Sequence, residues 1–218
     1  LSKLVNLIDS IGLQLAIHAI GDKAVETALK ALDLAAEKRN GSLVRKHRVE
    51  HCQVLSSELI KEFKRLKAVA SIQLSFAVSD SVFAVKRLGA ERVRYAYAWK
   101  TLVDNGILCC GGSDCPVETP NPLIGLYRII FRKDPKGTSW RPEECLPPEE
   151  ALKLITINAA AVSNEEDHRG YIKQGFAADL IVTSVNPLEN PGKLFEAKVL
   201  CTIKDGLITY SKLSSNSS

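Results

Sequence analysis

The sequence predicts an α/β fold: the carboxyl half of a (β/α)8 TIM barrel, followed by a small β segment. Strand-like apolar runs alternate with amphipathic helix patterns through residues 1–165. No hairpin signal joins one strand to the next, which indicates a parallel sheet covered by helices. Four such units are half of the eight in a complete barrel, which takes roughly 250 residues. From Gly170 onward the hydrophobic period changes to two, which is typical of β-strands.

Each predicted strand of the barrel part is followed by a predicted helix. The fourth strand has four apolar residues in a row between Asn105-Gly106 and Gly111-Gly112, a pattern typical of a buried parallel strand. The expected strands cover residues 13–18, 48–53, 68–73 and 107–110. The expected helices cover residues 23–38, 56–66 and 91–104.

Two further helices and three strands are expected beyond the fourth strand. Apolar residues predict a short helix over 124–131, and Pro148 at the first helical position predicts a helix that ends near Val162. Asp205-Gly206 is a strong hairpin signal. The strand patterns lie at 179–182, 199–203 and 207–210. The chain thus divides into a barrel domain over 1–165, a β-sandwich segment over 166–211 and a disordered tail over 212–218.

Composition excludes several classes of protein. The chain is 45% hydrophobic, and its net charge of +4 is carried by scattered basic residues, which argues against nucleic acid as a partner. The six cysteines form no CxxC spacing, so we expect a reduced, cytoplasmic compartment. No apolar run reaches membrane-spanning length, so we expect no membrane partner. The sequence lacks Met even at position 1, so we expect it to begin inside a longer polypeptide.

Three residues of metal-ligand type follow predicted parallel strands. His18 and His51 lie at or near the carboxyl ends of the first two strands, and Asp114 follows the fourth. Barrel enzymes place their active sites at this rim, and zinc commonly binds two imidazoles and a carboxylate. The alternatives are that each histidine is a hydrogen-bonded structural residue, and that Asp114 only caps the turn before Pro116. Strand alternation predicts that Asp114 shares a face with Leu108, Cys110 and Gly112.

His47 precedes His51 by four residues. On one strand the two side chains would lie roughly 13 Å apart, so we interpret His47 as structural. If this stretch were helical, the two histidines would share a face and could chelate a metal together. Val49, Cys52 and Gln53 favour the strand.

Five runs carry a family resemblance, and they occur in order at residues 17–24, 47–53, 87–92, 112–118 and 175–182. Together they resemble the signatures of the amidohydrolase superfamily, and within it those of the YtcJ-like, amidohydrolase-3 group. The resemblance covers residues 12–210 and implies a metal-dependent (β/α)8 barrel joined to a β-sandwich. It also implies that His18 and His51 bind a metal, and that Asp114 is both a metal ligand and the catalytic base that transfers the proton.

The resemblance implies a hydrolase that uses metal-activated water to cleave a non-peptide C–N bond in a small amide or N-substituted formamide. The expected cofactor is a divalent metal, zinc being the best suited, with one or two ions in the full-length protein. A homodimer is a further expectation. Gln53, Gln73 and Arg48 are candidate substrate-binding residues or partners of the metal ligands, and ordinary polar strand-end roles are the alternative.

Two features depart from the group's pattern. Its first-strand His-x-His pair and its metal-bridging lysine would lie before Leu1. It usually continues Gln73 with a proline and, two residues later, a histidine, whereas this chain has Leu74, Ser75 and Phe76. Two alternatives to the amide hydrolase therefore stay open. One is a truncated or degenerate barrel with a non-catalytic interaction or regulatory role, and the other is a hydrolase of C–O or C–Cl bonds.

Overall fold

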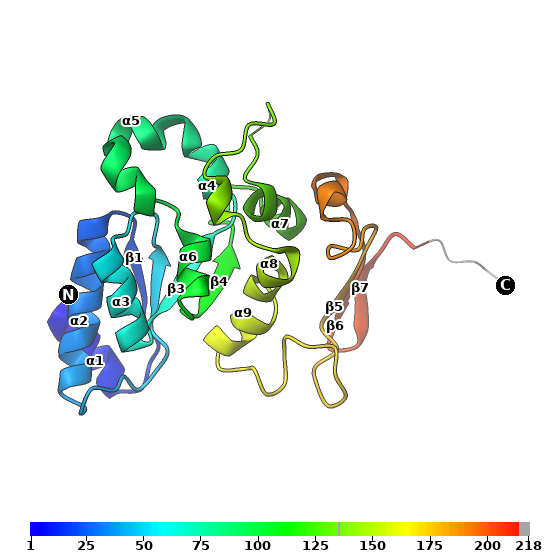
Figure 1. Cartoon of the computed structure of the whole chain (residues 1–218). Coiled ribbons are helices and arrows are strands. Elements are labelled where there is room, and N and C mark those ends of the chain that lie inside the picture. Colours follow the sequence, from blue (N-terminus) through cyan, green and yellow to red (C-terminus); the bar gives the residue numbers. More distant parts are fainter. Residues whose placement is uncertain (135, 214–218) are drawn as a thin grey trace.

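The computed structural model describes residues 1–134 and 136–213. A parallel sheet of four strands in the order β1-β2-β3-β4 forms the centre of the larger part (Figure 1). The predicted α/β class, with parallel strands followed by a separate β segment, is confirmed. The strands are β1 (Ala16–Ala19), β2 (Arg48–His51), β3 (Val69–Gln73) and β4 (Cys109–Gly112).

Helices cover the sheet from the first strand to the last. Helix α2 packs against β1 and α3, and α8 and α9 pack against β4 (Figure 1). The helices are α1 (Ser2–Ser10), α2 (Asp22–Glu37), α3 (Ser57–Leu66), α4 (Phe76–Ser79), α5 (Ser81–Arg92), α6 (Trp99–Asp104), α7 (Pro122–Phe131), α8 (Pro148–Leu154) and α9 (Ile157–Val162). Two 3-10 turns, η1 (Val93–Tyr95) and η2 (Pro142–Glu144), complete this part.

Helix α2 shows how the amphipathic pattern builds the core. Val25, Leu29, Leu32 and Ala36 recur at helical spacing, and all four are buried. Burying each Val or Leu side chain stabilises the fold by about 1.5–3 kcal/mol. This apolar stripe therefore fixes the helix against the sheet. The predicted helix over 23–38 is confirmed.

The single helix predicted over 91–104 is wrong. The chain instead leaves α5, passes through η1, and begins α6 at Trp99. Tyr97 adopts the left-handed conformation (φ 51°), which a helix cannot include. Its N–H donates to the Gln53 carbonyl over 2.7 Å, and its own carbonyl accepts from Arg132 Nη2 over 2.5 Å. These distant partners outweigh the local helical pattern.

The helix predicted from Pro148 to Val162 is divided in two. Thr156 lies between α8 and α9 with ψ −99°, and its hydroxyl donates to the Leu152 carbonyl over 2.8 Å. Such back-bonding competes with the helical hydrogen bonds. Asn158 also ties α9 to the sheet, because its Nδ2 donates to the Cys109 carbonyl of β4 over 3.0 Å.

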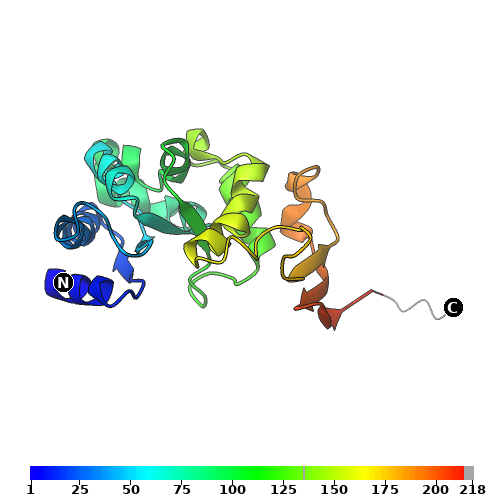
Figure 2. The same ribbon diagram turned by 90° about the horizontal axis from the view of Figure 1, so that it is seen from below.

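The β segment is a separate antiparallel sheet of three strands, β5 (Leu180–Thr183), β6 (Val199–Lys204) and β7 (Leu207–Ser211). The hairpin predicted at Asp205-Gly206 is confirmed, and both residues have positive φ, as a two-residue hairpin turn requires. A 3-10 helix, η3 (Pro191–Glu196), packs on α7. Figure 2 shows this segment at the opposite end of the molecule from α1. Of the tail expected to be disordered, residues 214–218 lie outside the described residues.

Leu74 is held between two glycines, Gly111 of β4 and Gly125 of α7. A β-carbon built on Gly111 would lie 2.7 Å from Leu74 Cδ2 and 3.2 Å from Ile155 Cγ2, and one on Gly125 would lie 3.1 Å from Leu74 Cδ1. Leu74 is only 2% exposed. It therefore has little room to move away from a larger neighbour.

We predict that Gly111→Ala destabilises the protein by about 1–3 kcal/mol, because the added methyl group overpacks a filled core. Gly112→Ala is the matched control, since its β-carbon would meet nothing within 4 Å. Thermal unfolding of both variants measures the difference, at roughly 2–4 °C per kcal/mol for a protein of this size. Equal melting temperatures for the two variants would show that Leu74 is not confined.

Candidate metal centre

The parallel pairing of β1 with β2 brings two histidines together. Ala19 is paired with His51 and His18 with Glu50, so the two side chains lie at the carboxyl ends of adjacent strands. Their ring centroids are 4.5 Å apart at an interplanar angle of 74°. His51 is buried and His18 is exposed. The sequence analysis placed both residues at this rim, and the structure makes them neighbours.

The ring of His51 is held on two sides. Its Nδ1 lies 2.8 Å from Gln73 Oε1, and its face stacks on the Phe76 ring at 6.2 Å and 9°. With the amide oxygen as acceptor, Nδ1 carries the hydrogen and Nε2 keeps a lone pair. Metal-binding histidines are commonly oriented by such a bond from their other nitrogen. The donor chemistry of His51 therefore fits a metal ligand.

Asp114 lies two residues beyond the end of β4. Its backbone is left-handed (φ 57°), so the alternation predicted from Leu108 to Asp114 stops at Gly112. The turn is closed by the Asp114 carbonyl, which accepts from Val117 N over 2.9 Å, and by the Ser113 hydroxyl, which accepts from Cys115 N. The exposed carboxylate has no hydrogen-bond partner among the described residues. It is therefore free to accept a proton or to approach a cation.

His18 and His51 fit a divalent ion as part of a ligand set. Within residues 1–134 and 136–213, no group of three or more His, Cys, Asp or Glu side chains is arranged to hold a metal ion. The structure thus brings together two of the three predicted ligands and leaves Asp114 apart from them.

The three predicted substrate-binding residues each have a partner within the protein. Gln73 holds His51, and Arg48 Nε lies 3.0 Å from Glu50 Oε1. Gln53 is almost fully buried, and its amide nitrogen donates to Asp80 Oδ2 over 2.7 Å. Their role toward a substrate stays a prediction.

The sequence analysis did not predict the cluster of Gln53, Asp80 and Tyr97, which we call the Asp80 network. The Tyr97 hydroxyl donates to Asp80 Oδ2 over 2.6 Å, and Gln53 Nε2 lies 3.2 Å from the same hydroxyl. Burial raises the pKa of the Asp80 carboxyl, against the opposing effect of these two donors. Burial, followed by the Asp80 carboxylate, raises the pKa of Tyr97. The sequence could not reveal this cluster, because nothing local connects its three residues.

His47 is structural, as predicted. Its Nε2 lies 2.9 Å from Asp9 Oδ1, and its Nδ1 accepts from Leu15 N over 3.1 Å. Both His47 and Asp9 are buried. The helical alternative, in which His47 and His51 share a face, is wrong because residues 48–51 form strand β2.

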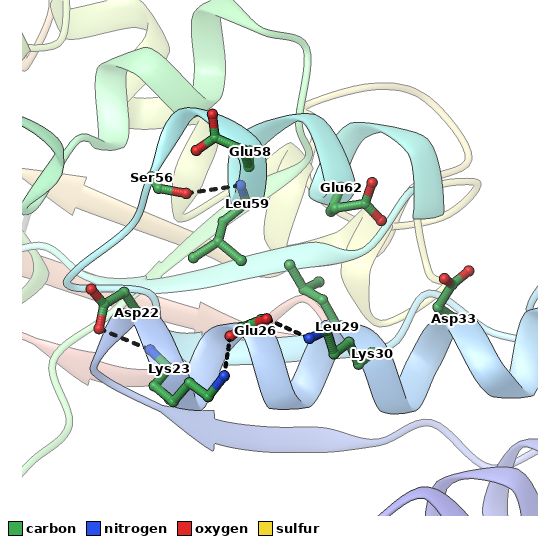
Figure 3. A pocket seen from close by; sticks show the side chains of 10 residues that line it. All are labelled: Asp22, Lys23, Glu26, Leu29, Lys30, Asp33, Ser56, Glu58, Leu59 and Glu62. Atoms are coloured by element: carbon green, nitrogen blue, oxygen red, sulfur yellow. Dashed lines mark hydrogen bonds and ion pairs between the residues drawn. The ribbon is translucent and has the colours of Figure 1, made fainter.

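Two cavities lie near the sheet. A groove of about 590 Å³ runs between α2 and α3, and its walls carry several carboxylates (Figure 3). Glu26 in this groove is paired with Lys23 and Lys30. The groove is therefore a solvated helix surface and not an acidic binding site. A smaller cavity of about 250 Å³ lies at the carboxyl end of β4 and reaches Ser75 and Ser113, beside Asp114.

The model of the amidohydrolase family, Amidohydro_3, matches residues 1–210. This chain belongs to the amidohydrolase family. It is 39% identical over 216 residues to YtcJ of Bacillus subtilis (strain 168), a presumed amidohydrolase by its name, and the match covers 97% of this chain and 40% of that protein. It is 35% identical over 212 residues to Protein LONG AFTER FAR-RED 3 of Arabidopsis thaliana, covering 96% of this chain and 36% of that protein.

An N-substituted formamide deformylase of Arthrobacter pascens is 28% identical over 208 residues, covering 94% of this chain and 38% of that protein. This amidohydrolase-family chain therefore spans about 40% or less of the length of these relatives. Uncharacterised metal-dependent hydrolases of Pyrococcus furiosus and Pyrococcus horikoshii OT3 share its fold, with TM-scores of 0.72 and 0.73 and identities of 32% and 27%. They cover 86% and 95% of this chain, and the matches take in 37% and 39% of those chains. Among the described residues, no helix is long and apolar enough to cross a membrane.

We predict that His47→Ala lowers stability and leaves metal content unchanged. The substitution removes one partner of the buried Asp9 carboxylate, which keeps the Val44 N–H and Arg39, at a cost of about 1–3 kcal/mol. Chemical denaturation and elemental analysis of the same preparation measure the two effects. A loss of metal that matches the loss in a His51→Ala variant would contradict the structural role.

Proposed function

We propose that the protein is a metal-dependent hydrolase that cleaves a non-peptide carbon–nitrogen bond in an amide or N-substituted formamide. The observation that carries this proposal is the pair His18 and His51, whose rings lie 4.5 Å apart at adjacent strand ends, with His51 oriented by Gln73. Membership of the amidohydrolase family supports the hydrolase class. The name of the deformylase relative supports the choice of bond.

His18 and His51 would hold a divalent ion, and zinc suits imidazole ligands best. When bound, such an ion supplies Lewis acidity, which lowers the pKa of water and polarises a carbonyl group. Asp114 would approach the ion as a ligand and take a proton from the attacking water. It would then deliver that proton to the leaving nitrogen, a role typically worth about 10²–10⁴-fold in rate. Its carboxylate suits this role because it has no hydrogen-bond partner among the described residues.

The cavity at the end of β4 supports a neutral substrate. None of the side chains that line it is charged, and its walls combine the Ser75 and Ser113 hydroxyls with apolar groups such as Ile155. Burying an unpaired charge in such a cavity is costly. If part of the substrate enters this cavity, an uncharged amide with a small substituent fits it better than a charged dipeptide. We also propose a cytoplasmic location, one or two bound ions and a homodimer.

The second candidate is a degenerate barrel with an interaction or regulatory role. Phe76 favours it, because an aromatic ring stacks on His51 where the related group usually has a histidine. The two candidates differ in whether the metal-loaded intact protein hydrolyses an amide-type substrate.

We predict that His18→Ala and His51→Ala each lower the metal content of the intact protein without unfolding it, because a site that loses one imidazole binds metal more weakly. Elemental analysis and circular dichroism test this, together with hydrolysis of a panel of N-substituted formamides, simple amides and dipeptides. Unchanged metal stoichiometry in both variants would overturn the ligand assignment. Full metal content without hydrolysis of any member would favour the degenerate barrel.

We predict that Asp114→Asn retains most of the metal and lowers kcat by at least about 10²-fold. The amide keeps the size of the side chain and one oxygen, and loses the basicity needed to accept a proton. Metal content and hydrolysis are measured in one preparation. A variant that keeps its metal and more than about a third of wild-type kcat lies far outside the range of general-base effects, so Asp114 would not be the base.

A further inference from the structure

The Asp80 network of Gln53, Asp80 and Tyr97 takes part in no step of the proposed chemistry, yet it begins two residues beyond His51. We propose that Asp80 and Tyr97 are positioning residues that hold His51 in the orientation required to bind metal. They act through Gln53 and through helix α4. This inference rests on the proposed function, because it takes His51 as a metal ligand.

The first link is the turn that ends β2. His51 and Cys52 both have positive φ, 79° and 52°, a conformation that non-glycine residues keep only when the surrounding structure enforces it. The Cys52 N–H donates to the Ala19 carbonyl over 3.2 Å, which ties the turn to β1. The Gln53 carbonyl accepts from the Tyr97 N–H over 2.7 Å, which ties it to the segment between η1 and α6. Displacing Tyr97 would therefore release one side of the turn.

The side chains of the network reinforce this backbone bond. Asp80 Oδ2 accepts from Gln53 Nε2 over 2.7 Å and from the Tyr97 hydroxyl over 2.6 Å. Gln53 and Tyr97 are each only 4% exposed, so water cannot easily replace the carboxylate. One carboxylate oxygen thus joins three segments that are distant in sequence: the loop after β2, the start of α5 and the residues before α6.

The second link runs through helix α4. Asp80 follows α4 directly, and its N–H donates to the Phe76 carbonyl over 2.9 Å. The Phe76 ring is the surface on which His51 stacks. Because its side chain is fixed to Gln53 and Tyr97, Asp80 also fixes the end of the helix that presents Phe76. Asp80 is therefore linked to His51 in two ways. One is the hydrogen bond to Gln53, which follows His51 in the chain, and the other is the Phe76 ring that stacks on His51.

A purely structural network would lower stability when broken and leave metal affinity unchanged, so metal affinity is the deciding measurement. We would titrate the metal-free intact protein with zinc against a competing chelator and record thermal unfolding of the same samples. The test variants are Tyr97→Phe, Asp80→Ala and Asp80→Asn. The controls are Tyr127→Phe, whose hydroxyl has no hydrogen-bond partner among the described residues, and Asp104→Ala, which removes only an exposed ion pair with Lys100.

We expect Tyr97→Phe and Asp80→Ala to weaken zinc binding by about 10-fold, the lower end of the range for removing a group bonded directly to a metal ligand, because both residues act on His51 through other residues. Asp80→Asn should recover much of the affinity, because its amide oxygen can still accept both hydrogen bonds. The two controls should bind zinc like the wild type. Tyr97→Phe removes a single oxygen atom, so it keeps the test decisive even if Asp80→Ala fails to fold.

The possible failures are distinguishable by a His51→Ala variant in the same titration. If that variant loses zinc while Tyr97→Phe binds as tightly as Tyr127→Phe, the positioning role is overturned and the proposed function stands. The positioning role is also overturned if the network variants lose stability but keep their zinc affinity. If His51→Ala binds zinc like the wild type, the metal assignment itself fails, and the positioning role fails with it.

Discussion

The left-handed turn at His51 and Cys52 is the constraint on which the arrangement of the site depends. It ends β2 beside the end of β1, where the Cys52 N–H donates to the Ala19 carbonyl. Without this turn, His51 could not face His18 while Gln53 reaches Asp80. Positive φ at non-glycine residues costs of order 1–3 kcal/mol each and persists where the surroundings enforce it, as they commonly do at functional sites. Asp114 has the same conformation after β4.

Leu74 and Phe76, the two apolar residues that depart from the group's pattern after β3, have different consequences. Leu74 fills the space between Gly111 and Gly125, so it contributes to packing between the sheet and α7. Phe76 instead stacks on His51, so it alters the immediate surroundings of the candidate metal ligand. A phenyl ring can orient an imidazole but cannot donate or accept a strong hydrogen bond. Of the two, Phe76 is therefore the departure that contacts a candidate metal ligand.

Much of the fold could be predicted from the sequence because hydrophobic period is a local property. The four parallel strands and the terminal hairpin were all predicted, and parallel pairing makes His18 and His51 neighbours. The break at Tyr97 could not be predicted, because the partners that enforce it, Gln53 and Asp80, are distant in sequence. For the same reason the sequence did not reveal α1, whose Asp9 holds His47, or the conformation of Asp114, which ends the predicted alternation.

The central claim is that His18 and His51 bind one divalent ion at the rim of the sheet. X-ray diffraction from crystals of the zinc-loaded intact protein, recorded at the zinc absorption edge, tests it most directly. The account predicts an anomalous peak within about 2.0–2.1 Å of a ring nitrogen of each histidine, the usual zinc–imidazole distance. For His51 that nitrogen is Nε2, because Gln73 occupies Nδ1. A zinc peak bound by neither histidine, with His51 still bonded to Gln73, would contradict the account.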